Sequence, residues 1–122
     1  MDNLKDKKCV GHEQMVKLNE EEIKNYLSEI NEVPHSTGLG SQGNFGSWEF
    51  LETNKIVKEF KLKDFVRAME FVNKIAVIAE EEGHHPDIAI YYNKVEITLW
   101  SHFISGLSIN DFIIAAKINN II

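Results

Sequence analysis

The sequence contains only one cysteine, Cys9, among 122 residues. A single thiol excludes an internal disulfide, and chains without disulfides are typical of the cytosol, so we expect a cytoplasmic protein. No run of about 18 apolar residues is present, so we expect no membrane-spanning helix. The first residues, 1–8, are polar and lack the apolar stretch of a signal peptide.

Basic residues are also scarce. Lysine and arginine number 13 against 19 aspartates and glutamates, which gives a net charge of −6. This balance argues against a nucleic-acid partner, because neutralising phosphates requires a basic face. The 43% of hydrophobic and 26% of charged residues are ordinary for a globular protein. The composition therefore predicts a chain that folds around one hydrophobic core.

The chain divides into three parts by pattern. Residues 1–17 are polar and irregular, which predicts a flexible N-terminal arm, and residues 18–122 form a single domain. Within this domain, residues 35–47 are rich in glycine and serine and predict a long loop. Residues 38–43 of the loop match the dinucleotide fingerprint GxGxxG, but that motif follows a strand and opens a helix. Here a helix precedes it and a strand follows, so we reject it.

Hydrophobic periodicity predicts seven regular elements in the order α-β-β-α-β-β-α. Helices are expected after Asn19, over 63–82 and after Ser108, with Gly83 ending the second one. Apolar positions at helical spacing predict the buried stripe of this second helix to be Phe65, Met69, Val72, Ile75 or Ala76, and Ala79. Strands are expected over 48–51, 56–62, 88–92 and 95–99. The order predicts an α+β fold, a four-stranded antiparallel sheet with helices packed on one face.

The two-residue turn expected at Asn93-Lys94 predicts the register of the last two strands. Tyr92 would face Val95, and His85 would then lie opposite His102, with their Cβ atoms roughly 4.5–5.5 Å apart. His84 is adjacent to this pair, and Glu80 lies one helical turn before His84. Three of the five histidines therefore converge near a carboxylate.

These residues closely resemble the signature of the pterin-4a-carbinolamine dehydratase family. The matching positions, with the family's spacing, are Glu80, His84-His85-Pro86, Tyr92, His102 and Asp111. The resemblance extends over about residues 48–120. It implies a lyase that removes water from a 4a-hydroxytetrahydropterin without a cofactor or metal, in the recycling of tetrahydrobiopterin.

The resemblance also implies roles for individual residues. His84 and His102 would form the acid–base pair and His85 would orient the pterin, since histidine titrates near neutral pH. Further contacts to the substrate would come from Glu80, Trp48, Pro86 and Asp111, with Trp48 as a stacking wall. The implied partners are the pterin itself, a functional link to an aromatic amino acid hydroxylase, and further copies of the chain in a homodimer or homotetramer.

Other interpretations remain open. Three histidines can hold a catalytic zinc ion. A dimerisation or coactivator module that has lost catalysis belongs to a different class of function. Asp111 completes a capping-box pattern with Ser108, so it could serve only the helix N-terminus. Trp48 and Tyr92 could be core aromatics, and Glu80 could be a solvated helix residue.

Overall fold

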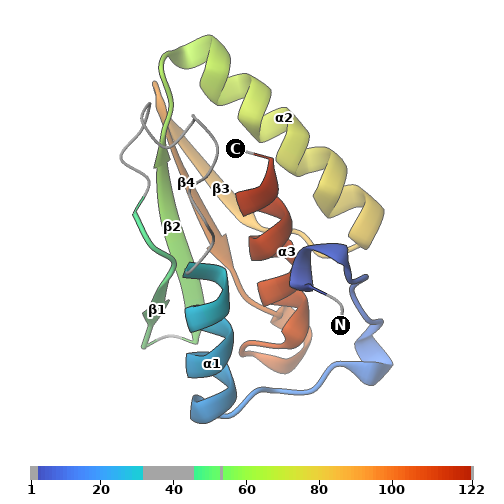
Figure 1. Cartoon of the computed structure of the whole chain (residues 1–122). Helices are drawn as coiled ribbons and strands as arrows, with labels where there is room; N and C mark the ends of the chain where they lie inside the picture. Colours follow the sequence, from blue (N-terminus) through green and yellow to red (C-terminus); the bar gives the residue numbers. More distant parts are fainter. Residues whose placement is uncertain (1–2, 32–45, 53, 122) are drawn as a thin grey trace.

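A computed structural model describes residues 3–31, 46–52 and 54–121. Three helices lie on one face of a four-stranded antiparallel sheet with strand order β1-β2-β4-β3, which confirms the predicted α+β fold (Figure 1). The elements are α1 (Glu20–Asn31), β1 (Glu49–Leu51), β2 (Lys55–Lys61), α2 (Phe65–Glu82), β3 (Asp87–Tyr91), β4 (Lys94–Leu99) and α3 (Ile109–Asn120), with short 3-10 turns η1 (Leu4–Asp6), η2 (His12–Gln14) and η4 (His102–Ile104). Within the described ranges, no helix is both long and apolar enough to cross a membrane.

Local signals set the helix ends as predicted. The Asn19 side chain accepts the Glu22 N–H at 2.8 Å, and the Glu22 carboxylate accepts the Asn19 N–H at 3.0 Å, a reciprocal cap. Ser108 caps α3 in the same way with Asp111. α2 begins at Phe65 rather than at residue 63, because the Asp64 carboxylate accepts the Arg67 N–H at 2.8 Å.

The pairing of β3 with β4 differs from the prediction by two residues. Ile88 pairs with Ile97 and Ile90 with Val95, whereas the predicted register placed Ile90 opposite Ile97. The turn consists of Tyr92 and Asn93, and Tyr92 has a φ of 55°. A two-residue shift leaves every side chain on its predicted face, because the side-chain period of a strand is two. It moves every residue to a different partner, however.

The second strand begins one residue earlier than expected. Leu51 pairs with Lys55, so Lys55 is the first residue of β2 and directly follows the turn that contains Asn54. Asn54 takes a φ of 62° there, which asparagine tolerates well, and its N–H reaches the Leu51 carbonyl at 3.0 Å. The predicted loop over 35–47 lies outside the described residues except for 46–47.

The buried stripe of α2 agrees with the prediction at Ile75 and Ala79 but not at its other positions. The side chains that face the core are Ala68, Phe71, Ile75 and Ala79. Of the predicted stripe, Phe65 is 49% exposed, Met69 and Val72 are half-buried and Ala76 is exposed. α2 therefore has two apolar stripes, and the small alanines of one of them face the core.

Lys58 interrupts the apolar side of β2 and lies on the covered face of the sheet. Its Nζ is 4.8 Å from the ring centroid of Phe60 and 3.3 Å from the Asn119 Oδ1. Burial lowers the pKa of the Lys58 ammonium to about 8, since a charged group loses hydration there.

We expect replacement of Lys58 by methionine to stabilise the fold at pH 7. The pKa of Lys58 is about 8 in the folded protein and 10.5 in the unfolded chain. Between these pH values the unfolded chain binds more protons than the folded protein, so the free energy of unfolding rises with pH. Chemical denaturation of both proteins from pH 7 to 10.5 measures the difference. The advantage of Lys58→Met should shrink as pH rises, and a constant difference would contradict the assigned cost of burial.

The segment before α1, predicted to be a flexible arm, lies beside α3 in the structure (Figure 1). The Leu4 side chain is buried, and the Val10 backbone exchanges two hydrogen bonds with the Asn110 side chain, at 2.8 and 2.9 Å. The Cys9 N–H donates to the Glu82 carboxylate at 2.7 Å. Burial, followed by the Glu82 charge, raises the pKa of the Cys9 thiol to about 12, so it is a poor nucleophile at neutral pH.

Candidate active site

A left-handed turn at the end of α2 places two adjacent histidines in different surroundings. Gly83 ends the helix with a φ of 66°, a conformation that costs glycine no Cβ clash. The chain then directs His84 inward, where the residue is 8% exposed, while the His85 side chain remains 61% exposed. The adjacent pair His84 and His85 thus consists of one buried and one accessible imidazole.

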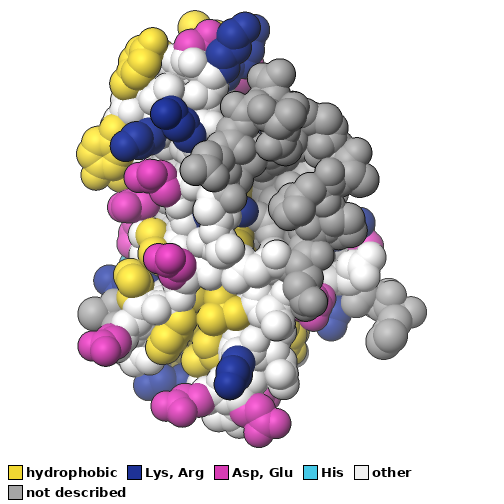
Figure 2. All heavy atoms as spheres, turned by 60° about the vertical axis from the view of Figure 1, so that its left-hand side comes forward, with side chains coloured by type: hydrophobic (Ala, Val, Ile, Leu, Met, Phe, Trp, Pro, Cys, Tyr) yellow, Lys and Arg dark blue, Asp and Glu magenta, His cyan; other side chains and the backbone are white. Residues whose placement is uncertain are grey.

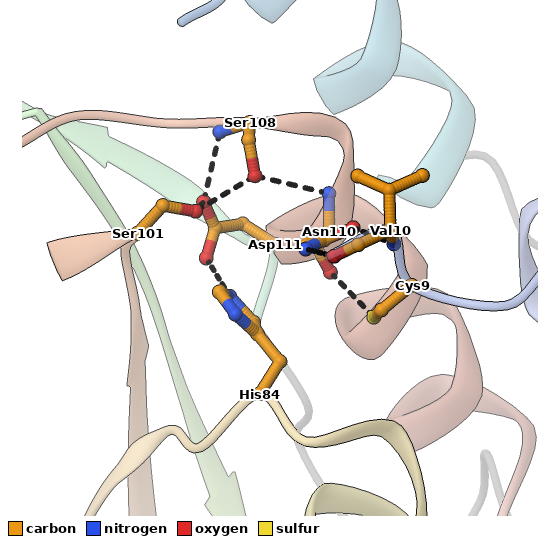
Figure 3. A network of polar contacts seen from close by, with 7 residues as sticks. All are labelled: Cys9, Val10, His84, Ser101, Ser108, Asn110 and Asp111. Atoms are coloured by element: carbon orange, nitrogen blue, oxygen red, sulfur yellow. Dashed lines mark hydrogen bonds and ion pairs between the residues drawn. The ribbon is translucent and has the colours of Figure 1, made fainter. Parts of the chain in front are cut away.

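Asp111 lies at the centre of a buried polar network (Figure 3). Its Oδ1 is 2.7 Å from the His84 Nε2, and its Oδ2 accepts hydrogen bonds from the Ser101 Oγ at 2.8 Å and the Ser108 N–H at 3.0 Å. The two serine hydroxyls are 2.7 Å apart, and the Ser108 Oγ accepts the Asn110 N–H at 3.2 Å. One carboxylate therefore joins the end of α2, the segment after β4 and the start of α3.

The network gives His84 a defined orientation. Asp111 is fully buried, and its position in the first turn of α3 suits a negative charge because the helix dipole is positive there. An imidazole that uses one ring nitrogen to bind a carboxylate has its tautomer and ring plane set by that bond. The His84 Nε2 is engaged by Asp111, which leaves the Nδ1 for an external group. Asp111 both caps the helix and holds the histidine.

Glu80 contacts the second histidine of the pair. The His85 Nε2 and the Glu80 Oε2 are 3.1 Å apart, and both side chains are well exposed, at 61% and 82%. Such a surface pair contributes little to stability. Its consequence is orientation, because the exposed imidazole is tied to a carboxylate one turn back along α2.

His102 does not pair with His85, so this part of the prediction is wrong. β3 begins at Asp87 and β4 ends at Leu99, and His102 instead begins the turn η4. Its ring is exposed and packs against Trp100, with the ring centroids 3.9 Å apart. His102 nevertheless follows Ser101 directly, as His85 follows His84. Since Ser101 and His84 bind the same carboxylate, that of Asp111, the backbone positions of the three histidines lie in one part of the structure.

The structure does not bring Trp48 to these histidines. Its side chain is 2% exposed, and its Nε1 donates to Asn119, at 3.0 Å. Asn119 follows Asp111 by eight residues, which corresponds to about 12 Å along an α-helix. Trp48 is thus a core aromatic, and its predicted role as a stacking wall has no support here. Pro86 is half-buried, just before β3, where a missing N–H disrupts no ladder.

The other predicted residues and the cavity lie elsewhere. Tyr92 is 68% exposed in the β3–β4 turn. A cavity of about 380 Å³ is lined by Gly46, Ser47, Glu49, Val57, Lys58, Glu59 and Glu96 and by no histidine. Figure 2, which brings the side of β1 and β2 forward, likewise shows no histidine among the described residues. Over those same residues, no group of three histidine, cysteine, aspartate or glutamate side chains could hold a metal ion, so the zinc interpretation gains no support.

Sequence reasoning missed Ser101 and gave Ser108 only a capping role. Both hydroxyls bind the Asp111 carboxylate or each other inside the network. Ser101 immediately precedes His102, and both serines have fully buried side chains. The available signal was that Ser101 is a polar residue next to the predicted catalytic His102. Its partner Asp111, however, lies ten residues further along the chain, in α3.

Comparison with known proteins places the site in a family. Residues 16–121 match the model of the family described as pterin 4 alpha carbinolamine dehydratase. A protein of Alkaliphilus metalliredigens is 38% identical over 120 residues, which cover 98% of this chain and 96% of that protein. A protein of Sulfolobus acidocaldarius is 42% identical over 106 residues, 87% of this chain and 99% of that one. Both bear the name "Putative pterin-4-alpha-carbinolamine dehydratase".

A solved structure agrees with these relatives. The crystal structure of a transcriptional coactivator/pterin dehydratase from Brucella melitensis superposes with a TM-score of 0.71 at 29% identity, covering 87% of this chain and 98% of that one. The predicted resemblance is confirmed: the chain belongs to the pterin 4 alpha carbinolamine dehydratase family.

Proposed function

We propose that the chain removes water from a 4a-hydroxytetrahydropterin to give the quinonoid dihydropterin. The departing 4a-hydroxyl leaves as water after it gains a proton, and a pterin ring nitrogen loses one, so the protons balance. The observation that supports this proposal is the buried His84–Asp111 pair at 2.7 Å. Asp111 binds His84 and Ser101, and each of these residues is followed directly in the chain by an exposed histidine, His85 or His102. Histidine suits both proton transfers near neutral pH.

Each histidine has its own part in the proposal. His84, held through its Nε2, presents the Nδ1 to the pterin, and His102 supplies the second acid–base group. His85, tied to Glu80, orients the substrate. Either His84 or His102 can deliver the proton to the hydroxyl while the other takes one from the ring. Pro86 shapes the wall beside His85.

The wider setting is proposed on the family and its relatives. Pterin dehydratases act on the product that aromatic amino acid hydroxylases release, so we place the chain after such a hydroxylase in tetrahydrobiopterin recycling, in the cytoplasm. The names of the relatives from Alkaliphilus and Sulfolobus support the dehydratase activity. All three proposed catalytic histidines are present, which favours an enzyme over a module that has lost catalysis.

A direct assay tests the activity. The purified chain is added to synthetic 4a-hydroxytetrahydropterin, and formation of the quinonoid product is followed by absorbance after pretreatment with a chelator. We expect dehydration well above the spontaneous rate, unchanged by chelation. A rate equal to the spontaneous one would refute the enzyme, and activity lost on chelation but restored by zinc would favour the three-histidine zinc site.

The second apolar stripe of α2 supports a homo-oligomer. Phe65 is 49% exposed and Ala76 is exposed, and Met69 and Val72 lie half-buried between them on the same side of the helix. Exposed apolar surface that is continuous along one element marks a protein–protein contact. We propose that a second copy of the chain covers this stripe. The Brucella protein is described as a transcriptional coactivator/pterin dehydratase, so the alternative is that a different protein covers this stripe.

Glutamate at Ala76, an exposed position in this stripe, should dissociate the oligomer without disturbing the monomer. A charge buried in an apolar contact loses its hydration. The control is Lys74→Glu, which places the same side chain on the polar side of α2. Mass measurement by light scattering should show a smaller species for Ala76→Glu alone. Monomers in the unaltered protein would instead favour the different partner.

A further inference from the structure

His102 lacks the kind of support that the other two histidines have. A carboxylate binds the ring of His84, and a second carboxylate binds the ring of His85. Across the residues that the structure describes, the His102 ring makes no hydrogen bond, and its one ring contact is with Trp100. The centroids are 3.9 Å apart and the planes are tilted by 30°.

Trp100 is itself held by its neighbours on the sheet. Ile56 pairs with Leu99, so the next position along each strand places Lys55 beside Trp100. The Lys55 Nζ lies over the indole, 4.6 Å from the ring centroid. An ammonium at this distance from an indole face is attracted by the electron density of the ring. Trp100 therefore contacts a cation on β2 and the imidazole of η4.

Within the part of the chain that the structure describes, the indole N–H of Trp100 adds no hydrogen bond to these ring contacts. The Nε1 is buried and has no hydrogen-bond partner among the described residues. A tryptophan N–H usually finds a partner when it is buried, because an unpaired donor costs free energy. The described contacts of Trp100 are therefore those of its ring, with Lys55 and His102.

We propose that Trp100 is a positioning residue for His102, fixing the plane of an exposed imidazole that gives or takes a proton in the reaction. This inference rests on the proposed function for its catalytic consequence, but the stack itself is independent of it. Without Trp100, the His102 side chain is free to rotate on the turn η4. A small displacement of a reacting group costs much of the rate, roughly 100-fold for 1 Å.

The test combines spectra with kinetics for Trp100→Leu and Trp100→Phe. The indole ring current should shift the His102 ring protons upfield in the unaltered protein. In Trp100→Leu these resonances should move toward random-coil positions, and kcat should fall on the order of 10-fold with a smaller change in KM. Trp100→Phe retains an aromatic face and should recover part of both. The control is Phe103→Leu, which removes an exposed aromatic from the same turn that stacks on His12 rather than on Trp100.

The outcomes distinguish a failure of the positioning role of Trp100 from a failure of the proposed function. Unchanged His102 resonances in Trp100→Leu would overturn the positioning role. Moved resonances with an unchanged kcat would overturn it as well, because the orientation would then not matter to catalysis. An equal loss in Trp100→Phe and Trp100→Leu would show that the aromatic face is not what positions His102. An unaltered protein without dehydratase activity would instead refute the proposed function, and the spectra would still judge the stack.

Discussion

Changing His84 to glutamine and His102 to alanine together is expected to reduce dehydration to near the spontaneous rate. Positioned acid–base groups each contribute roughly 10²–10⁴-fold, and the proposed reaction has no other group at these positions to replace them. Glutamine at position 84 keeps an N–H that can reach the buried Asp111 carboxylate, so the fold is spared the cost of an unpaired charge. His102 is exposed, and its removal leaves no cavity.

The kinetics of dehydration are measured for both single variants and the double variant, with circular dichroism as the check on folding. The control is His12→Ala, which removes an exposed histidine that stacks on Phe103 and makes no contact with Asp111. It should retain full activity. Near-normal turnover in the folded double variant would show that the assignment of these two histidines is wrong.

Replacement of Asp111 by alanine should have the largest effect on stability. The change leaves the His84 Nε2 and the Ser108 N–H without their acceptor in a buried site. The Ser101 Oγ keeps its hydrogen bond with the Ser108 hydroxyl. Each buried donor left without a partner costs about 1–3 kcal/mol, so the two together remove a large part of the roughly 5–15 kcal/mol that is typical of a whole domain. Asp111→Asn keeps the shape and should lose less stability, but it should lower activity because it no longer sets the His84 tautomer.

The matched control is Asp64→Ala at the start of α2. Asp64 also accepts a backbone N–H at a helix N-terminus, from Arg67 at 2.8 Å, but it binds no histidine. Loss of such a cap costs typically about 1 kcal/mol. Urea unfolding of the variants gives both free energies. Equal losses for Asp64→Ala and Asp111→Ala would mean that Asp111 acts only as a cap.

The elements of the fold were predictable from the sequence because their signals are local. Asn19, Gly83 and Ser108 end or begin helices through contacts within a few residues, and all three do so in the structure. The β3–β4 register was not predictable from the turn. Asn93-Lys94 suits a two-residue turn on local preference, but packing of Ile88 against Ile97 occurs in a register that requires Tyr92 at positive φ.

The faces of α2 show a second limit. Both of its stripes are apolar at helical spacing, and periodicity alone does not distinguish the stripe that meets the core from the one that remains outside. The motif named candidate site residues but gave no information about their contacts. The partners of Asp111 come from positions 27 and 10 residues away in the chain, and only tertiary structure brings His84 and Ser101 to one carboxylate.

The same carboxylate has a consequence for the order of folding. Contacts between residues far apart in sequence require loop closure, so they form later than a single helical turn does. α2 and α3 can each acquire their backbone hydrogen bonds before His84 meets Asp111, but the oriented imidazole exists only once both loops have closed. Recovery of enzyme activity during refolding therefore reports the arrival of long-range order, and it should lag behind the recovery of helical signal.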